Sequence, residues 1–543
     1  MGGGANRKRR RVPAPHPSPH PARGERGLDV LRDDAASPKT PEPQMTKHAD
    51  LLSLSSVEMR RRIGSKEISP VELLEACIER VAEINPAVNA VTATCYARAR
   101  REAKAAEKAV RDGDTLGALH GLPVGVKDLE NTGGLLTTYG SPLYRDNIPE
   151  ADTVMVARLR AAGGIIVAKT NVPEFGAGAN SRNVVWGATG NPFDPTKNAS
   201  GSSGGSAVAL ATDMLPVCTG SDTGGSLRIP GAVNGVVGFR PSPGLVPHTM
   251  RQLGWSAISV LGPMGRTVAD TCQLMAVQAG QHAIDPLSYD VDAAGFAAPK
   301  PADLGGLKVA WTEDFGTSPV DKPIRKVFRE RIKAMRHLFL KCDESKPDLG
   351  KIDECFDVVR AIAFVGRYRD AYEKDPSSLG PNIRANYELG AKMTMADVAW
   401  AQLEQTRIYR KFQALFQDYD LVLAPTVPVS PFPWTQLYLA EMGGKPLRNY
   451  YHWLSLTYVV TLATNPAISI PCGVDHAGFP FGLQVVGKAR ADGFVLSAAH
   501  AMEQAFSADP ALKRPLPDLT KLMKPTPALK SIVTHPPKRT DMK

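Results

Sequence analysis

Apolar residues at helical spacing mark the start of the ordered part of the sequence. The run Ser69-Pro70-Val71-Glu72 combines an N-cap serine, a proline at the first helical position and a glutamate at the third, which is the pattern of a capping box. Apolar residues then recur every three or four positions, at Leu74, Cys77, Ile78 and Val81. We therefore predict a helix here and a second one, rich in Ala, Lys and Arg, over residues 95–112.

Short apolar runs alternate with helical patterns from about residue 117. The first run, Leu122-Pro123-Val124-Gly125-Val126, leads directly into Lys127-Asp128. A helical pattern over 152–162 is closed by Gly163-Gly164. Further strand candidates are residues 165–168, 215–219, 307–311, 421–424, 467–470 and 482–486, while residues 320–420 are mostly helical. This alternation predicts an α/β fold with one mixed, twisted β-sheet covered by helices on both faces.

Composition divides the chain into four parts. Residues 1–45 contain a run of five basic residues at 7–11 and eight prolines, which predicts a disordered tail because so few apolar groups cannot offset the entropy of ordering. A nuclear localisation patch, or upstream sequence before a true start at Met45, are the other interpretations of this segment. We expect N-terminal helices packed on the core over 46–115, a single large core over 116–507, and a loose C-terminal tail over 508–543.

The net charge of +10 does not indicate a nucleic-acid partner. Residues 1–44 hold nine Lys and Arg against five Asp and Glu, so +4 of this charge lies in the tail. The remainder is spread over the body of the chain, and aromatic residues make up only 6%. Nucleic-acid binders concentrate basic charge in one stripe and supply aromatic stacking partners. We therefore expect no nucleic-acid partner.

The cysteines and the apolar runs both favour a cytoplasmic protein. Seven cysteines are scattered without any C-x-x-C pair, which indicates reduced thiols rather than a disulfide framework or a zinc site. No apolar stretch reaches the roughly 18 residues that a transmembrane helix needs. We therefore expect neither a membrane partner nor a metal.

The first of two glycine and serine clusters is Gly201-Ser202-Ser203-Gly204-Gly205-Ser206, and it runs into the helix-forming residues 207–211. One interpretation is a flexible linker. Because free backbone N–H groups at a helix N-terminus attract negative charge, we favour an anion or oxyanion site instead. No Gly-Lys-Ser or Gly-Lys-Thr follows, so the cluster is not a phosphate loop.

A sharper alternative makes Ser203 a nucleophile. Residues 201–205 formally match the G-x-S-x-G elbow of α/β-hydrolases. That elbow must follow a strand directly, whereas turn-forming residues 194–200 precede this cluster. The elbow also requires a histidine, and no local motif singles out His476 or His500. We therefore favour this interpretation less.

The second cluster, Gly220-Ser221-Asp222-Thr223-Gly224-Gly225-Ser226, is typical of a nucleophile loop. Its consecutive N–H groups could hold the oxyanion formed when Ser226 attacks an acyl carbon. A serine hydroxyl still requires a base. Lys127 is the candidate, because it ends an apolar strand, and burial lowers the pKa of a lysine until it can accept a proton near neutral pH.

Taken together, these segments resemble the amidase signature family. Residues 201–231 resemble the signature itself, and residues 121–128 resemble the strand that carries the family's lysine. Connecting and closing motifs follow the family's order at residues 170–175, 191–194, 465–471 and 482–484. Lys127 precedes Ser202 by 75 positions, and Ser202 precedes Ser226 by 24, which are spacings of that family. The resemblance covers about residues 50–505.

The resemblance implies a Ser–cis-Ser–Lys triad. Ser226 would attack the acyl carbon, and Ser202, carried on a cis peptide bond, would relay the proton to neutral Lys127. The oxyanion hole would consist of the backbone amides of Thr223, Gly224, Gly225 and Ser226. Three further residues match motif positions that hold the loop, namely Ser203, Asp222 and Arg228. No metal or organic cofactor is implied.

The substrate that the resemblance implies is a small-molecule amide. Residues 454–462 lack the acidic residue by which the glutamine-using subunit of transfer-RNA amidotransferases holds its amino acid. We therefore expect a stand-alone amidase acting on small to medium, mostly apolar amides, with anilides, esters and carbamates as further substrates. The amidotransferase subunit is the alternative. The sequence leaves the oligomeric state open, a homodimer included. The family's signature usually has glycine where this chain has Ser200.

Overall fold

The computed structural model describes Met1, residues 48–251 and residues 253–542. The tail predicted over residues 1–45 therefore lies almost entirely outside the described residues. The described residues from 48 onward belong to one compact unit.

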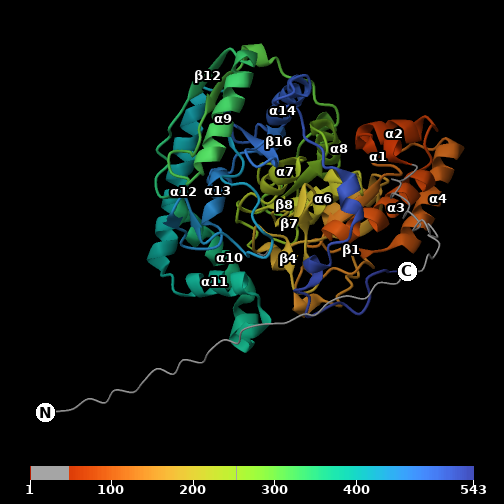
Figure 1. Cartoon of the computed structure of the whole chain (residues 1–543), viewed down its shortest axis with the longest axis horizontal. Coiled ribbons are helices and arrows are strands. Elements are labelled where there is room, and N and C mark those ends of the chain that lie inside the picture. The colour runs from red at the N-terminus through yellow and green to blue at the C-terminus, as the bar shows by residue number, and fades with distance from the viewer. Residues whose placement is uncertain (2–47, 252, 543) are drawn as a thin grey trace, which may run out of the picture. The chain divides into compact units, whose positions relative to one another are not determined.

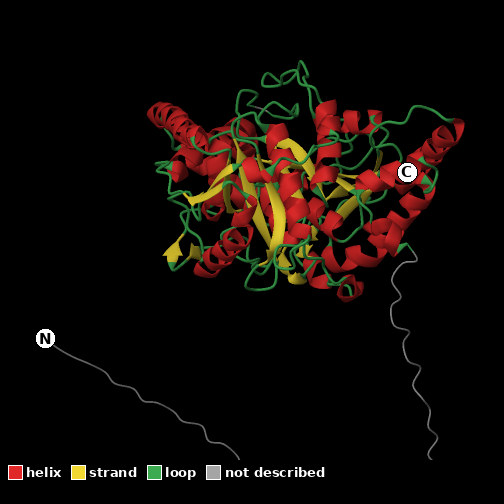
Figure 2. Cartoon of the chain, turned by 90° about the horizontal axis from the view of Figure 1, so that it is seen from above, coloured by secondary structure: helices red, strands yellow, loops and turns green. Residues whose placement is uncertain are grey.

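A mixed sheet of eleven strands forms the centre of this unit. Figure 2 shows the strands lying between helices. The parallel pairs are β2–β3, β2–β8, β11–β13 and β11–β12, and the other neighbours are antiparallel. In spatial order the strands are β1 (Val91–Thr94), β3 (Ile165–Thr170), β2 (Pro123–Lys127), β8 (Val217–Asp222), β10 (Val260–Gly265), β9 (Val237–Arg240), β16 (Ala467–Val474), β17 (Pro480–Gly487), β13 (Leu421–Pro425), β11 (Lys308–Trp311) and β12 (Lys341–Glu344).

Helices cover both faces of the sheet, as the sequence predicts. The two faces are visible along β17, where a Cβ added at Gly482 would meet Ala232 of α7, while one added at Gly487 would meet Val495 of α14. Residues an odd number of positions apart in a strand point to opposite faces. Figure 1 shows the helices around the sheet. Their bounds are α1 (Ala49–Ser53), α2 (Ser56–Gly64), α3 (Pro70–Val88), α4 (Tyr96–Asp112), α5 (Val154–Ala161), α6 (Gly204–Ala211), α7 (Arg228–Asn234), α8 (Val268–Gln278), α9 (Lys322–Met335), α10 (Ile352–Lys374), α11 (Pro381–Ala391), α12 (Met395–Ala414), α13 (Ser455–Leu462) and α14 (Asp492–Ser507).

The parallel pairing of β2 with β8 brings distant parts of the chain together. Val124 lies opposite Val217, and Gly125 lies opposite Cys218. Because the two strands are parallel, their carboxyl ends reach the same edge of the sheet, with Lys127 ending β2 and Asp222 ending β8. Helix α6 packs on both strands, and its N-terminus holds Ser203 as N-cap. Ligands in α/β sheets are bound beyond the carboxyl ends of strands.

The C-terminal segment differs from the loose tail that the sequence predicts. Four apolar side chains of residues 508–542 are buried, namely Leu512, Leu522, Leu529 and Met542. Backbone hydrogen bonds join Thr94 to Thr540 and to Met542. The apolar residues of this segment are far apart in sequence because the chain runs over the body in an irregular path. Their pattern therefore has no period that could have indicated packing.

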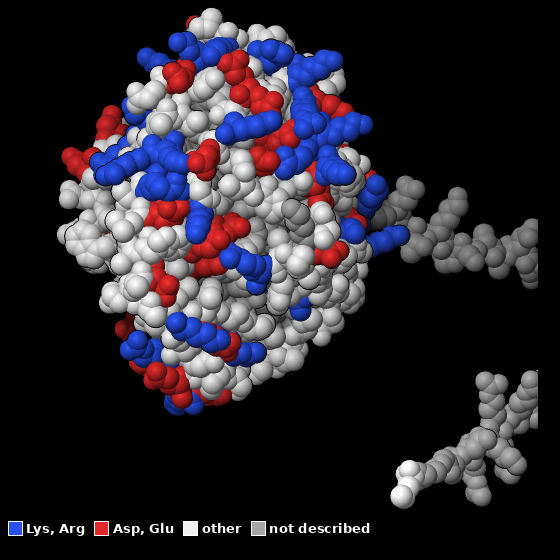
Figure 3. Space-filling view, turned by 90° about the vertical axis from the view of Figure 1, so that its left-hand side faces the viewer, with Lys and Arg blue, Asp and Glu red and all other residues white. Residues whose placement is uncertain are grey.

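Charged side chains of both signs are interspersed on the face shown in Figure 3. Ion pairs of the described surface include Lys411 with Asp348 at 2.6 Å, and the exposed Arg448 with the half-buried Asp357 at 3.1 Å. This face thus lacks the single basic stripe that nucleic-acid binding requires. None of the helices in the described residues has the length and apolar character that crossing a bilayer would demand.

Candidate active site

Lys127 is a buried amine surrounded by hydroxyl groups. Lys127 is the last residue of the fully buried strand β2, and it is 1% exposed. The Nζ atom lies 2.9 Å from Ser202 Oγ, 2.7 Å from Ser203 Oγ and 2.9 Å from Ser221 Oγ. It also lies 3.3 Å from the carbonyl oxygen of Ser221. No salt bridge joins this amine to any carboxylate of the described residues.

Burial lowers the pKa of Lys127 to about 7, although Asp222 and Glu130 act in the opposite direction. Desolvation disfavours the charged ammonium, and hydroxyl groups compensate for only part of the hydration it has lost. The amine is therefore partly neutral at physiological pH. A neutral amine has two N–H donors and one lone pair, so it can accept a proton from a neighbouring hydroxyl.

Ser202 and Ser203, two of the three serines of the first cluster, differ in their access to the cavity. The Gly201–Ser202 peptide bond is cis, as the resemblance implies. Ser202 lines the large cavity beside the carboxyl ends of β2 and β8, whereas Ser203 is fully buried and does not line it. Ser203 therefore contacts Lys127 from inside the protein. An elbow nucleophile at Ser203 is excluded by this burial, and neither His476 nor His500 lines the cavity.

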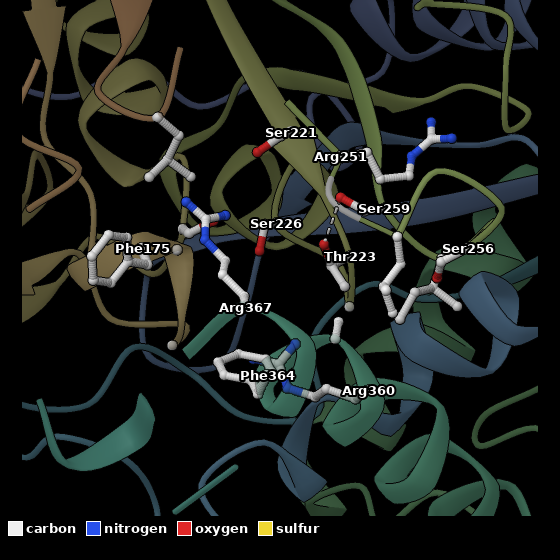
Figure 4. A pocket seen from close by; sticks show the side chains of 18 of the residues that line it. Phe175, Ser221, Thr223, Ser226, Arg251, Ser256, Ser259, Arg360, Phe364 and Arg367 are labelled. Carbon is white, nitrogen blue, oxygen red and sulfur yellow. Dashed lines mark hydrogen bonds between the residues drawn. The ribbon is translucent and has the colours of Figure 1, made fainter. Parts of the chain in front are cut away.

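The loop that carries Ser226 is held by its own carboxylate, Asp222. Asp222 Oδ1 accepts from the backbone N–H of Gly225 at 2.9 Å, and Oδ2 accepts from that of Leu227 at 3.2 Å. Thr457 donates its hydroxyl to the carbonyl of Gly224 at 2.6 Å. These bonds fix the loop on both sides of Ser226. The side chain of Ser226 faces the cavity (Figure 4), and it makes no hydrogen bond to Ser202 in the described residues.

Asp222 is itself held by two buried arginines. Arg228 donates to both carboxylate oxygens at 3.0 Å, and Arg240 Nη1 donates to Oδ1 at 3.0 Å. Burial alone would raise the pKa of Asp222, but the two guanidinium groups outweigh it and hold that pKa well below its usual range. The carboxylate is therefore ionised, and it can accept the loop's amides at any physiological pH. Arg228 also contacts Gln484 and the carbonyl of Thr457, which ties the loop to β17 and α13.

Three of the four amides predicted for the oxyanion hole have no protein acceptor among the described residues: those of Thr223, Gly224 and Ser226. All three residues line the cavity. The fourth amide, that of Gly225, donates to Asp222. Gly225 has φ +121°, and a Cβ there would lie 2.3 Å from Thr457 Oγ1. Glycine is therefore required for the loop to pass Thr457 in this conformation.

The wall of the cavity is mostly apolar and aromatic. Figure 4 shows Ser221, Thr223 and Ser226 together, with Phe175 on one side and Phe364 of α10 below. Leu454 is the member of the 454–462 stretch that lines the cavity. The aromatic residues of the lining are Tyr139, Phe175, Phe356, Phe364, Tyr368, Tyr450 and Tyr451. Such walls suit an apolar or aromatic group.

Several residues of this site are not among those predicted from the sequence. Ser221 contacts Lys127, Arg240 holds Asp222, and α10 supplies much of the cavity wall. Ser221 lies in the second glycine and serine cluster, but the sequence gives it no separate role, and no local motif marks Arg240. No three His, Cys, Asp or Glu side chains in the described part of the chain form a group that could hold a metal ion.

The chain is similar to known proteins over most of its length. The sequence model of the amidase family matches residues 72–496. An acylamidase of Rhodococcus erythropolis is 33% identical over 453 residues, covering 83% of this chain and 95% of the relative. A glutamyl-tRNA(Gln) amidotransferase subunit of Acaryochloris marina is 34% identical over 473 residues, covering 82% and 97%. The structure of a bacterial aryl acylamidase of the amidase signature family superimposes with a TM-score of 0.78 at 26% identity, over 84% of this chain and 96% of that one. The chain therefore belongs to the amidase signature family, whose members hydrolyse amide C–N bonds.

Proposed function

We propose that this protein is an amidase that hydrolyses small to medium, mostly apolar carboxylic amides with Ser226 as nucleophile. The observation that carries the proposal is the contact of a buried amine, Lys127, with a hydroxyl that lines the cavity, Ser202. A stand-alone amidase is also supported by the acylamidase relative. Anilides, esters and carbamates would react through the same acyl-enzyme chemistry.

The first step forms the tetrahedral intermediate that precedes the acyl-enzyme. Ser226 Oγ attacks the carbonyl carbon of the amide while its proton passes to Ser202, and the proton of Ser202 passes to Lys127 Nζ. The resulting oxyanion accepts hydrogen bonds from the free amides of Thr223, Gly224 and Ser226. One such donor contributes roughly 3–4 kcal/mol to stabilisation of the transition state. The Gly225 amide acts indirectly, because its bond to Asp222 shapes the loop.

Cleavage of the C–N bond then uses the proton stored on Lys127. It returns through Ser202 to the leaving nitrogen, which departs as a neutral amine. Water attacks the acyl-enzyme, and the neutral lysine accepts a proton from that water by the same relay. The carboxylic acid leaves, and Ser226 regains its proton. Lys127 contributes as the base only while it is uncharged, which its burial favours.

The alternative is the glutamine-hydrolysing subunit of a transfer-RNA amidotransferase. The relative from Acaryochloris marina, 34% identical, favours it. Against it stands Leu454, which lines the cavity in the stretch where the resemblance would require an acidic residue. Hydrolysis of simple anilides by the isolated protein, with glutamine left intact, supports the stand-alone amidase; the opposite preference supports the alternative.

A fluorophosphonate probe tests the nucleophile. We expect it to label the wild-type protein covalently at Ser226 and to leave Ser226→Ala unlabelled and inactive. Ser256→Ala is the matched control, because Ser256 also lines the cavity but lies outside the nucleophile loop. Labelling of Ser226→Ala to the wild-type extent, with retained turnover, would contradict the proposal. Circular dichroism shows whether each variant keeps the fold.

A further inference from the structure

Helix α10 presents two arginines to the cavity, and neither has a carboxylate partner. Arg360 and Arg367 both line the cavity that Ser226 faces. They are seven positions apart, which places them two turns apart on one side of the helix. No carboxylate of the described residues lies within 4.0 Å of either guanidinium. By contrast Arg251, the third arginine of the lining, is paired with Asp285 at 3.1 Å.

Arg360 is a buried cation held only by neutral groups. Its residue is 7% exposed, and a guanidinium keeps its charge in proteins. Nη2 donates to the hydroxyl of Tyr450 at 2.7 Å, and Nε donates to Asn386 Oδ1 at 3.2 Å. The group lies 4.9 Å from the ring centre of Phe364. Nη1 has no acceptor among the described residues and is not enclosed, so it is available to a molecule in the cavity.

Arg367 extends over the same cavity from the next turns of α10. Its guanidinium lies 5.4 Å from the ring centres of both Phe175 and Tyr368. Figure 4 shows it rising between Phe175 and Ser226. These aromatic contacts hold the guanidinium in one place while leaving its N–H groups without a charged acceptor. Arg367 is exposed, so it can meet a substrate as it enters.

The other titratable groups of the lining do not neutralise these two charges. Glu130 is the acidic residue of the lining within the described part of the chain, and burial raises its pKa to about 7. The charge of Lys169 acts on it, and Lys169 Nζ donates to the carbonyl of Glu130. Burial also lowers the pKa of His248 to about 3, so that ring is neutral. The cavity therefore combines aromatic walls with an excess of positive charge.

We propose that the substrate carries a carboxylate, bound by Arg360 and Arg367, at the end of an apolar or aromatic body whose amide reaches Ser226. This inference rests on the proposed amidase function and narrows its substrate class to amides bearing one anionic end. The planar guanidinium matches the two oxygens of a carboxylate, and a buried unpaired cation gains most from such a partner. A site built around such groups discriminates strongly against a substrate that leaves them unpaired.

Matched substrates test this proposal in the wild-type protein. One anionic substrate, adipic acid monoanilide, carries its carboxylate on the acyl side of the amide. The other, 4-(butyrylamino)benzoate, carries it on the amine side. The neutral counterparts carry an isopropyl group in place of the carboxylate. We expect kcat/KM to favour at least one anionic substrate over its neutral counterpart by about tenfold or more, a preference that weakens as salt is added. Equal or better turnover of both neutral substrates would overturn the proposal while leaving the amidase function intact.

Variants on α10 assign the effect to the two arginines. Arg367→Met and Arg360→Met should each lower the ratio of kcat/KM for the preferred anionic substrate to kcat/KM for its neutral counterpart by about tenfold, mainly through the KM of the anionic substrate. Arg369→Met is the control, since Arg369 is exposed on the same helix and does not line the cavity. Arg367 is exposed, so its variant tests the proposal even where Arg360→Met fails to fold. Unchanged selectivity in Arg367→Met, and in Arg360→Met where that variant folds, would overturn the assignment. If no anilide is cleaved and no fluorophosphonate label appears, the amidase function itself fails.

Discussion

The amine of Lys127 lies 2.9 Å from the hydroxyl of Ser202, although the two residues are 75 positions apart. The parallel pairing of β2 with β8 and the packing of α6 on both strands bring them together. Ser202 lines the cavity, while Lys127 and Ser203 do not. A proton leaving a substrate-bound nucleophile therefore reaches the amine by way of a hydroxyl that faces the cavity.

The acidic limb of the pH–rate profile should report Lys127. Its pKa is lowered to about 7 by burial. Below this pH the ammonium form dominates and cannot accept a proton, so kcat/KM should fall about tenfold per pH unit; above it the amine is neutral and the rate levels off. Lys127→Arg, which keeps a positive charge at all accessible pH values, should be inactive throughout. Stopped or continuous anilide assays from pH 5 to 9 measure the profile.

A substitution at Glu130 tests whether Lys127 controls the acidic limb, because it should move the limb in one direction only. Glu130, whose own pKa is raised to about 7, is partly ionised near neutral pH, and its negative charge there raises the pKa of Lys127. Glu130→Gln removes the charge, which should lower that pKa further and move the acidic limb to lower pH. Glu150→Gln, at an exposed glutamate, should leave the limb in place. Movement of the limb to higher pH in Glu130→Gln would show that another group controls it.

Two serines that line the cavity contact Lys127 through their hydroxyls. Substitution of each serine should show which hydroxyl relays the proton to the amine. Ser202 Oγ and Ser221 Oγ both lie 2.9 Å from Nζ. The carbonyl of Ser221 can only accept, so it receives an N–H of the amine, and the proposed relay requires the lone pair of the amine to face Ser202. Ser202→Ala should lower kcat by about 10²–10⁴, the usual effect of losing general acid–base catalysis. Ser221→Ala should lower it by less than about tenfold; the reverse order would make Ser221 the relay.

The fold could be predicted largely because its central strands are fully buried. Mostly apolar runs indicate β2, β3, β13, β16 and β17, and each strand begins within two residues of its predicted start. The strands β9 and β10 were missed, since β10 (Val260–Gly265) contains two glycines and a proline, which weaken any strand pattern. The strand β1 was missed because it has four residues between two long helices.

The site could be predicted where its chemistry lies in short motifs, and not where tertiary packing supplies it. Ser202, Ser226 and Lys127 stand in recognisable segments. Arg360 is one charged residue in a long helix, and nothing local distinguishes it from exposed arginines of the same helix. Its role depends on Tyr450 and Asn386, which reach it from segments 90 and 26 positions away. Such partners become visible only once the chain is folded.

Removal of the Asp222 charge should destabilise the protein strongly. Asp222→Asn would leave the fully buried guanidinium groups of Arg228 and Arg240 without their carboxylate. Breaking a buried pair typically costs about 3–5 kcal/mol, because a charge is left uncompensated. Asp348→Asn is the comparison, since Asp348 pairs with Lys411 at the surface and such pairs contribute less than about 1 kcal/mol. Urea unfolding measures both; similar values for the two variants would contradict the expectation.

A methyl group at Gly225 should disable the nucleophile loop. The added Cβ would lie 2.3 Å from Thr457 Oγ1 and 2.5 Å from Ile229 Cδ1, at a φ of +121°. The loop must shift, and the free amides beside Ser226 shift with it, so Gly225→Ala should lose most of its turnover. Gly443→Ala is the control, because Gly443 also has positive φ but nothing lies within 4 Å of an added Cβ. Activity of Gly225→Ala at the level of this control would contradict the geometry.

Ser200 occupies a position where glycine should be more stable. Its φ is +59°, a left-handed conformation that costs a residue with a Cβ roughly 1 kcal/mol. Its hydroxyl donates to the carbonyl of Ala179 at 3.3 Å, a long bond that offsets only part of this cost. Ser200→Gly should therefore raise the free energy of unfolding by up to about 1 kcal/mol and leave kcat/KM within about twofold. Ser200→Ala keeps the Cβ and loses the hydrogen bond, so it should be less stable than the wild type. If Ser200→Gly instead proves less stable than Ser200→Ala, the left-handed backbone conformation does not determine which residue is most stable at this position.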